Sequence, residues 1–229
     1  MEDSILFDSR IVIFAGRFGS GKTEVAANYA ARLAREREGV ALVDLDLITP
    51  YYRTREMAEA LAQQGVEVVA PAAATQQLDL PAVTAEILAV LQDRERPLVL
   101  DVGGDEEGAR AGLGPFSHSL ARMDYILTLV VNPYRQHTSS VGGIAQAVEQ
   151  IERGSGLKVN GLISNPNLIA ETTLSVVERG HSLIEEASRA LGLPIAFLCL
   201  EERLARQIPR DHFPQPILPL MRYFLPPWQ

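Results

Sequence analysis

A glycine-rich loop ending in Lys-Thr lies between the first apolar run of this chain and its first amphipathic segment. The loop spans Gly16 to Thr23, reads GRFGSGKT and fits the pattern G-x-x-x-x-G-K-[ST]. In such a loop the glycines let the chain curl, so that successive backbone N–H groups converge on an anion at a helix N-terminus. A chance match is rare in this context, and the loop therefore predicts a phosphate-binding site on an α/β fold.

Short runs rich in Val, Ile and Leu alternate with amphipathic segments along the whole chain. The predicted strands are 11–15, 40–45, 66–70, 98–102, 125–131, 159–163 and 195–200. The predicted helices are 22–37, 53–64, 81–91, 139–153 and 172–191. Because the apolar residues of the strands are consecutive, both faces of the sheet should be covered. We expect an α/β fold, a three-layer sandwich with a mostly parallel sheet between helices.

The 229 residues show no linker, repeat or shift in composition, so a single domain over residues 1–229 is expected. Only the tail 208–229 differs, because its six prolines exclude a long amphipathic helix. This tail should run extended over the body of the domain and pack against it. Membrane recruitment by a C-terminal amphipathic helix is not expected.

Charge and composition limit the kinds of partner. The formal net charge of −8 argues against general nucleic-acid binding, which depends on Lys and Arg. No apolar run approaches the roughly 20 residues that span a bilayer, and the first ten residues do not resemble a secretory signal. The single cysteine, Cys199, cannot form an intrachain disulfide. We expect a cytoplasmic protein that binds neither nucleic acid nor membrane.

The residue types within the glycine-rich loop suit different parts of a nucleoside triphosphate. Lys22 would reach the β and γ phosphates, and the Thr23 hydroxyl would hold Mg²⁺. The residues expected to bind the nucleotide phosphates are Gly16, Arg17, Gly19, Ser20, Gly21, Lys22 and Thr23. The expected cofactors are thus a nucleoside triphosphate and Mg²⁺.

Asp101 comes after the apolar residues Leu98, Val99 and Leu100 near the end of the predicted strand 98–102, and it begins the sequence Asp-Val-Gly-Gly. A carboxylate at such a strand end is costly unless it lies near a cation, so we expect Asp101 in the Mg²⁺ shell, directly or through water. Gly104 could offer its N–H to the γ-phosphate and move when that phosphate leaves. The alternative is a solvated aspartate that opens a turn.

Asp44 and Asp46 end the second predicted strand and share one of its faces, because strand side chains alternate. The pair could position an attacking water or organise metal-bound waters. Asp46 could instead only cap the following turn. The candidate catalytic residues are Lys22, Asp44, Asp46 and Asp101.

Four segments together resemble a known family. GRFGSGKT, DLDLITPYYRTRE from Asp44, DVGG from Asp101 and GLISNPNL from Gly161 are similar in order and spacing to the MinD/ParA and cobyrinic acid a,c-diamide synthase group. That group consists of P-loop ATPases of the SIMIBI class, relatives of the nitrogenase iron protein. The resemblance covers nearly the whole chain and is highest to a subgroup of small ATP-binding proteins.

The resemblance implies hydrolysis of ATP with Mg²⁺, with residues 44–55 as switch I and the DVGG stretch as switch II. It also implies that Asn165 hydrogen-bonds the base, and an asparagine amide can pair with N6 and N7 of adenine. Guanine-binding members usually have an aspartate three residues later, where this chain has Leu168, which favours ATP over GTP. Asn165 could alternatively serve a turn before Pro166.

Arg17 departs from the family pattern. Members that dimerise over two nucleotides typically have G-K-G-G-x-G-K-[ST], and this chain has Arg17 and Phe18 at the second and third positions. Arg17 could act as an arginine finger across a homodimer, since a guanidinium can bridge phosphate oxygens. It could equally point into solvent.

Two polar clusters follow the ends of predicted strands, where α/β proteins bind ligands. One contains Tyr51, Tyr52, Arg53 and Arg55, and the other spans 132–137 and includes Arg135. Together they could form an anion-binding or partner-docking face, or they could be exposed loops without a ligand.

Three functions fit these residues. The leading one is a molecular switch ATPase that acts on an unidentified partner protein. A second is an ATP-dependent small-molecule kinase or ligase resembling dethiobiotin synthetase, in which Arg53, Arg55 and Arg135 would clamp a carboxylate substrate. The third is an adaptor that binds the nucleotide without hydrolysing it.

Overall fold

The computed structural model describes residues 5–46, 54–69, 87–209 and 211–223. Eight strands in these residues form one sheet in the order β3-β2-β4-β1-β5-β6-β7-β8, and all neighbouring strands are parallel. The strands are β1 (Ile11–Gly16), β2 (Ala41–Leu45), β3 (Glu67–Val69), β4 (Leu98–Gly103), β5 (Tyr125–Val131), β6 (Gly161–Ser164), β7 (Ile195–Glu201) and β8 (Ile217–Leu220).

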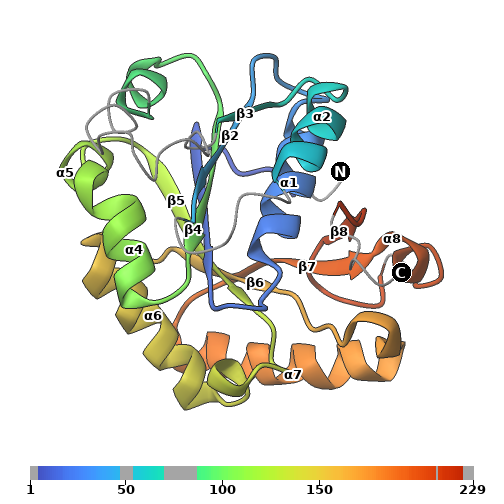
Figure 1. Ribbon diagram of the computed structural model, residues 1–229. Helices are drawn as coiled ribbons and strands as arrows, with labels where there is room; N and C mark the ends of the chain where they lie inside the picture. Colours follow the sequence, from blue (N-terminus) through green and yellow to red (C-terminus); the bar gives the residue numbers. More distant parts are fainter. Residues whose placement is uncertain (1–4, 47–53, 70–86, 210, 224–229) are drawn as a thin grey trace.

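Helices connect most of these strands (Figure 1). They are α1 (Lys22–Leu33), α2 (Thr54–Ala62), α4 (Glu106–Leu113), α5 (Ser117–Leu120), α6 (Val141–Ser155), α7 (Leu174–Leu191) and α8 (Glu202–Ala205). Residues 87–92 are also helical. Short 3₁₀ turns lie at Gly114–Phe116, Gln136–Thr138 and Ile169–Glu171. None of the helices in the described ranges is long and apolar enough to span a bilayer.

Helices cover both faces of the sheet, and alternate residues of the central strand show this. Val12 and Phe14 of β1 belong to the core beneath α1 and α2. Ile11 and Ile13 belong to the opposite core, which contains residues of α4, α6 and α7. Because side chains alternate along a strand, fully buried consecutive apolar residues require a helical layer on each side. The predicted three-layer α/β fold with a parallel sheet is confirmed.

Helix α4 was not predicted from the sequence. Asp105 caps its first turn, accepting a hydrogen bond from the Gly108 N–H at 2.7 Å. The helix packs closely on β4 and α6, and Ala109 and Leu113 are fully buried. Its small residues permit this close approach but give little apolar pattern, so the segment EEGARAGL carries no clear helical signal in the sequence.

The proline-rich tail contributes the edge strand β8, which pairs with β7. Directly after it, the Met221 N–H donates to Asn28 Oδ1 and the Asn28 amide donates to the Met221 carbonyl, both at 2.8 Å. The Tyr223 N–H also donates to the Glu24 carboxylate at 3.1 Å. The tail is therefore fixed to α1, the helix that follows the glycine-rich loop. Phe224 and Trp228 lie outside the described residues.

Candidate nucleotide-binding site

The carboxyl ends of three neighbouring strands meet at the glycine-rich loop. β1 leads directly into the loop and lies beside β4, which in turn lies beside β2. In the β2–β4 register Asp44 is opposite Asp101. Since parallel strands end at the same edge of a sheet, the predicted carboxylates of β2 and β4 are brought to the loop that carries Lys22 and Thr23.

Both functional side chains of the loop are paired with these carboxylates. Lys22 Nζ lies 2.5 Å from Asp46 Oδ2, and the two side chains are 11% and 10% exposed. The Thr23 hydroxyl donates to Asp101 Oδ2 at 2.5 Å. Asp44 accepts a hydrogen bond from the Asp46 backbone N–H at 3.0 Å, which ties the two aspartates together at the end of β2. The structure thus brings all four candidate catalytic residues together.

Burial dominates the electrostatics of this cluster. Desolvation raises the pKa of Asp101 to about 7, against the attraction of Lys22 and with the added repulsion of Asp44. The pKa of Asp44 is also raised, first by burial. Burial alone would lower the pKa of Lys22, but the attraction of Asp101, Asp46 and Asp44 outweighs it and raises that pKa. Lys22 is therefore positively charged at neutral pH, and Asp101 is poised to gain or lose a proton.

The donor set beside Asp101 fits a magnesium ion. Asp101 Oδ1 is buried and has no hydrogen-bond partner among the described residues. Its other oxygen and the Thr23 hydroxyl lie together. Mg²⁺ prefers such hard oxygen ligands and usually takes one or two carboxylates together with substrate phosphates. Thr23 and Asp101 are thus able to hold Mg²⁺ jointly with a bound triphosphate.

Gly104 lies against the first peptide group of the loop. A Cβ atom at Gly104 would overlap the Gly16 carbonyl group and the Arg17 nitrogen. Only glycine permits this approach. The segment after Asp101 is therefore in direct contact with the loop, as a segment that responds to the γ-phosphate would need to be.

Two side chains that follow the neighbouring strands β5 and β6 donate hydrogen bonds to carbonyl groups of the glycine-rich loop. The Asn165 amide donates to the Ser20 carbonyl at 2.6 Å, and Arg135 Nε donates to the Gly19 carbonyl at 2.9 Å. Gly21, with φ 83°, is the N-cap residue of α1 and packs against the Asn165 amide. Because the C=O and N–H of a trans peptide point in opposite directions, the bond to Ser20 turns the Gly21 N–H away from Asn165.

Arg17 contacts its own chain. Its Nη2 donates to Gln150 Oε1 of α6 at 2.5 Å. Its Nε is buried without a hydrogen-bond partner in the part of the chain that the structure describes, as is the Ser20 hydroxyl. A role of Arg17 across a homodimer stays a prediction. In contrast, the neighbouring Phe18 is 91% exposed.

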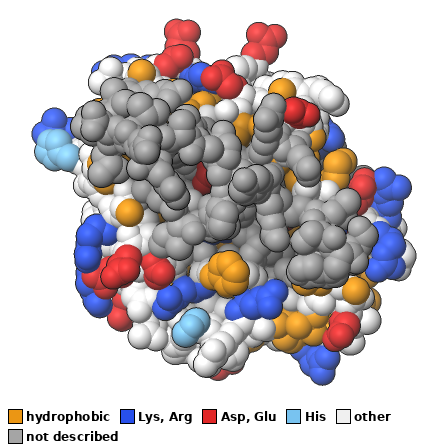
Figure 2. Space-filling model, viewed as in Figure 1, with side chains coloured by type: hydrophobic (Ala, Val, Ile, Leu, Met, Phe, Trp, Pro, Cys, Tyr) orange, Lys and Arg blue, Asp and Glu red, His pale blue; other side chains and the backbone are white. Residues whose placement is uncertain are grey.

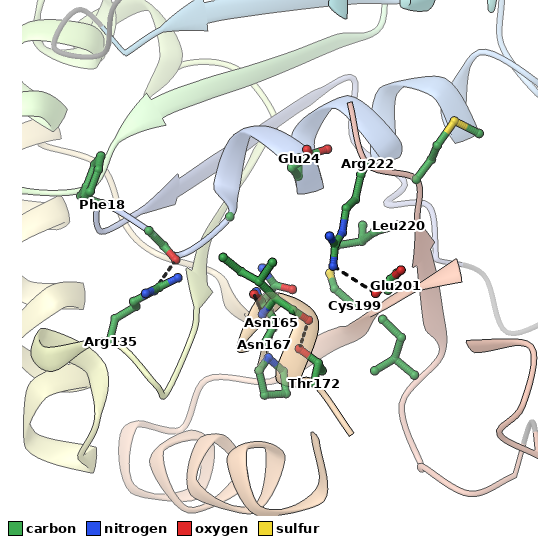
Figure 3. Close-up of a pocket in the computed structure, with 16 residues that line it drawn as sticks. Phe18, Glu24, Arg135, Asn165, Asn167, Thr172, Cys199, Glu201, Leu220 and Arg222 are labelled. Atoms are coloured by element: carbon green, nitrogen blue, oxygen red, sulfur yellow. Dashed lines mark hydrogen bonds and ion pairs between the residues drawn. The ribbon is translucent and has the colours of Figure 1, made fainter. Parts of the chain in front are cut away.

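A pocket of about 490 Å³ extends from the loop toward β7 and the tail. Figure 3 shows Arg135 at one side, Asn165 in the middle, and Glu201 with Arg222 at the other side. Its lining includes the apolar residues Pro166, Ile169, Cys199, Leu200, Leu220 and Met221. A volume of this order, with an apolar lining and few polar groups, is typical of small-molecule sites.

Sequence reasoning missed the far end of this pocket. Glu201 and Arg222 form an ion pair of 3.1 Å there. Glu201 is the last residue of β7, so the strand-end argument applied to Asp101 and Asn165 would have found it. Arg222 carries no sequence signal, because it comes from the tail.

The two predicted polar clusters have different outcomes. Tyr51, Tyr52 and Arg53 lie outside the described residues, as does the Arg55 side chain. In the cluster 132–137, Asn132 is fully buried and bonded to the loop after β6, through the Asn167 carbonyl. Arg135 lies at the glycine-rich loop, so this cluster borders the candidate site.

Comparison with known proteins supports the fold. A family model described as Zeta toxin matches residues 8–102, less than half of the chain, and this segment contains both the loop and Asp101. None of the curated proteins matches the sequence. Solved structures with the same fold include two FtsY proteins and FlhF.

Chloroplast FtsY from Physcomitrella patens has a TM-score of 0.57 and 19% identity over 86% of this chain and 62% of that one. Cell division protein FtsY from Thermotoga maritima has a TM-score of 0.59 and 20% identity over 86% and 67%. FlhF complexed with GTP/Mg(2+) has a TM-score of 0.53 and 17% identity over 84% and 66%. This chain spans about two thirds of their length, and identities this low show the fold alone. That fold is the P-loop NTPase fold, and the finer resemblance to the MinD/ParA group stays a prediction.

Proposed function

We propose that this chain is a Mg²⁺-dependent ATPase that works as a molecular switch on a partner protein. The observation that carries the proposal is the pairing of Lys22 with Asp46 at 2.5 Å. In this pairing the phosphate-binding cation of the loop is held by the first residue after β2. A nucleotide phosphate and Asp46 therefore compete for the same ammonium group.

This competition couples nucleotide binding to the segment that begins at Asp46. When a triphosphate enters, Lys22 exchanges the carboxylate for phosphate oxygens, and Asp46 is released. Gly104, which contacts the loop at Gly16, gives the chain after β4 a second connection to the γ-phosphate position. Two segments thus change their contacts together, as in switches that are ordered by a γ-phosphate.

Hydrolysis would use the same residues. Lys22 and the loop amides would stabilise the charge that develops on the transferred phosphoryl group. Mg²⁺, held by Thr23 and Asp101, would neutralise phosphate charge. Released Asp46, or Asp44 beside it, would orient the attacking water. In this scheme one carboxylate blocks the loop before binding and serves the reaction after it.

ATP is proposed as the nucleotide because Leu168 stands where guanine-binding relatives have an aspartate. FlhF was solved with GTP, so the comparison offers GTP as the competing choice. A binding titration with both nucleotides decides between them.

A protein partner is proposed from the exposed aromatic residue at the loop. Phe18 is 91% exposed, beside the residues that would bind phosphate. Figure 2 shows hydrophobic and basic side chains next to one another in the lower half of this face. Aromatic residues and arginines are enriched at protein interfaces. A partner that covers Phe18, including a second copy of this chain, would contact the loop directly.

The test is calorimetric titration with Mg²⁺ and ATP, followed by a phosphate-release assay. Wild type should bind ATP, and Lys22→Ala should weaken binding at least 100-fold, because a charge-assisted phosphate contact is lost. Lys158→Ala is the matched control, since the Lys158 side chain is exposed, pairs with Glu152 at 2.7 Å and does not line the candidate site. No heat with wild type would refute the proposal. Binding without phosphate release, under every partner condition, would favour the adaptor.

A small-molecule kinase or ligase is the second candidate. The partial match to the Zeta toxin model and the position of Arg135 at the Gly19 carbonyl favour it. It predicts that ATP consumption depends on a metabolite and yields a phosphorylated or amidated product. Turnover that rises only with a protein would favour the switch.

A further inference from the structure

Asn165, which the family resemblance places at the base, also holds the glycine-rich loop. The Asn165 amide already donates to the Ser20 carbonyl at 2.6 Å, and the residue is only 2% exposed. Its hydrogen-bonding capacity is thus partly used to hold the loop. A base in the pocket needs other polar groups, because a buried base edge without partners is costly.

Glu201 and Arg222 supply such groups. Their ion pair of 3.1 Å lines the pocket, with the side chains 32% and 30% exposed. Figure 3 shows the pair beside Cys199 and Leu220, at the side opposite Arg135. Apolar neighbours suit the flat faces of a base, and the pair places a hydrogen-bond acceptor next to a donor.

The main chain around Arg222 is fixed on both sides. Met221 makes two hydrogen bonds with Asn28 of α1, each of 2.8 Å. The Tyr223 N–H donates to Glu24 of the same helix at 3.1 Å. Helix α1 begins at the glycine-rich loop. The Glu201–Arg222 pair and this loop are therefore both positioned by the same helix.

We propose that Glu201 and Arg222 recognise the adenine of ATP, an inference that rests on the proposed function. The Glu201 carboxylate accepts a hydrogen bond from the 6-amino group, and the Arg222 guanidinium donates to the adjacent ring nitrogen N7. Adenine presents this donor and acceptor side by side, whereas guanine presents two acceptors, O6 and N7, at the same edge. Guanine O6 would face the carboxylate, and this pair therefore selects adenine.

The test removes the proposed hydrogen bond in two ways. One uses a ligand that lacks the 6-amino donor, and the other uses a variant that lacks the Glu201 acceptor. ATP is compared with purine riboside 5′-triphosphate, which lacks the 6-amino group, in calorimetric titrations with Mg²⁺. Wild type should bind ATP roughly tenfold more tightly than the analogue, as expected for a hydrogen bond to a charged acceptor. In Glu201→Ala the two ligands should bind equally. Glu202→Ala is the matched control, because Glu202 of α8 pairs with Arg206 and the variant should keep the tenfold ratio.

The outcomes separate this inference from the proposed function. If Lys22→Ala abolishes binding but Glu201→Ala keeps the wild-type ratio, the loop binds nucleotide and the base contact is refuted. Equal affinity of wild type for the two ligands, or tighter binding of GTP than of ATP, also overturns it without any variant. Binding of no nucleotide at all overturns both proposals.

Discussion

The Thr23 hydroxyl donates to one oxygen of Asp101 at 2.5 Å, and the other oxygen of Asp101 is buried without a partner among the described residues. Within the part of the chain that the structure describes, this second oxygen is an unused hydrogen-bond acceptor. Because its pKa is raised to about 7, its charge varies within the physiological range.

Magnesium-nucleotide binding should therefore depend on pH through Asp101. Mg²⁺ binds the carboxylate, so below pH 7 a proton must leave first and the affinity should fall toward tenfold per pH unit. Above about pH 8 the affinity should no longer change with pH. Titrations in buffers of different ionisation enthalpy would measure the proton released. Asp101→Asn should bind weakly with no such pH dependence, and a wild-type affinity that is constant from pH 5.5 to 8 would contradict the idea.

The same residue should lower the stability of the unliganded protein at high pH. Its folded-state pKa lies above the unfolded value of about 3.9, so the folded state binds more protons between these values and stability falls as pH rises from 4 to 7. Asp101→Asn should then be more stable than wild type at pH 8, by on the order of 1–3 kcal/mol. Urea unfolding at pH 5 and pH 8 would measure this, with a smaller difference expected at pH 5.

Asp46→Ala should separate binding from hydrolysis. Removal of the competing carboxylate frees Lys22 for phosphate, so ATP should bind roughly 3–10-fold more tightly. Phosphate release should fall if Asp46 orients water. Asp105→Ala, which removes a helix cap outside the cluster, controls for general loss of stability. An unchanged affinity in Asp46→Ala would show that the ion pair does not oppose ATP.

Gly104→Ala tests the contact between the chain after β4 and the loop. The added methyl group would overlap the Gly16 carbonyl, so the backbone must shift at a cost of roughly 2–4 kcal/mol. Thermal unfolding would measure the loss. Gly142→Ala is the control, because nothing lies within 4 Å of a Cβ there. Equal melting temperatures for the two variants would refute the close packing.

Asn28→Ala should loosen the tail. The variant loses two hydrogen bonds to Met221 and leaves a backbone N–H and C=O without their partner, at an expected cost of roughly 2–3 kcal/mol. Proteolysis at the C-terminal end should become faster, and ATP should bind more weakly because Arg222 is less well held. Wild-type protease resistance would argue against a docked tail.

The fold was predictable because its strands are buried on both faces and read as apolar runs. The phosphate loop was predictable because its chemistry requires glycines and lysine at fixed spacing. Helix α4 was missed because EEGARAGL gains its stability from close packing on β4 and α6, which no local pattern encodes.

Outside the glycine-rich loop, the site was predictable where its residues lie at the carboxyl end of a strand or directly after it in the sequence. Asp44, Asp46 and Asp101 fit that rule, since parallel strands end together. The bond between Asn165 and Ser20 could not be predicted, because it joins segments far apart in the chain. The approach of Arg222 could not be predicted, because no sequence pattern indicates that the proline-rich tail pairs with β7. Such contacts depend on the sheet order, which was not predicted.

The Lys22–Asp46 pair also bears on small competitors of the nucleotide. An orthophosphate or sulfate ion that enters the loop finds Lys22 already paired with Asp46 and must displace that carboxylate to bind. A single tetrahedral anion has few other contacts with which to offset that cost, whereas a triphosphate chain with its metal and base has many. Abundant inorganic anions should therefore bind the loop weakly and compete little with a nucleoside triphosphate.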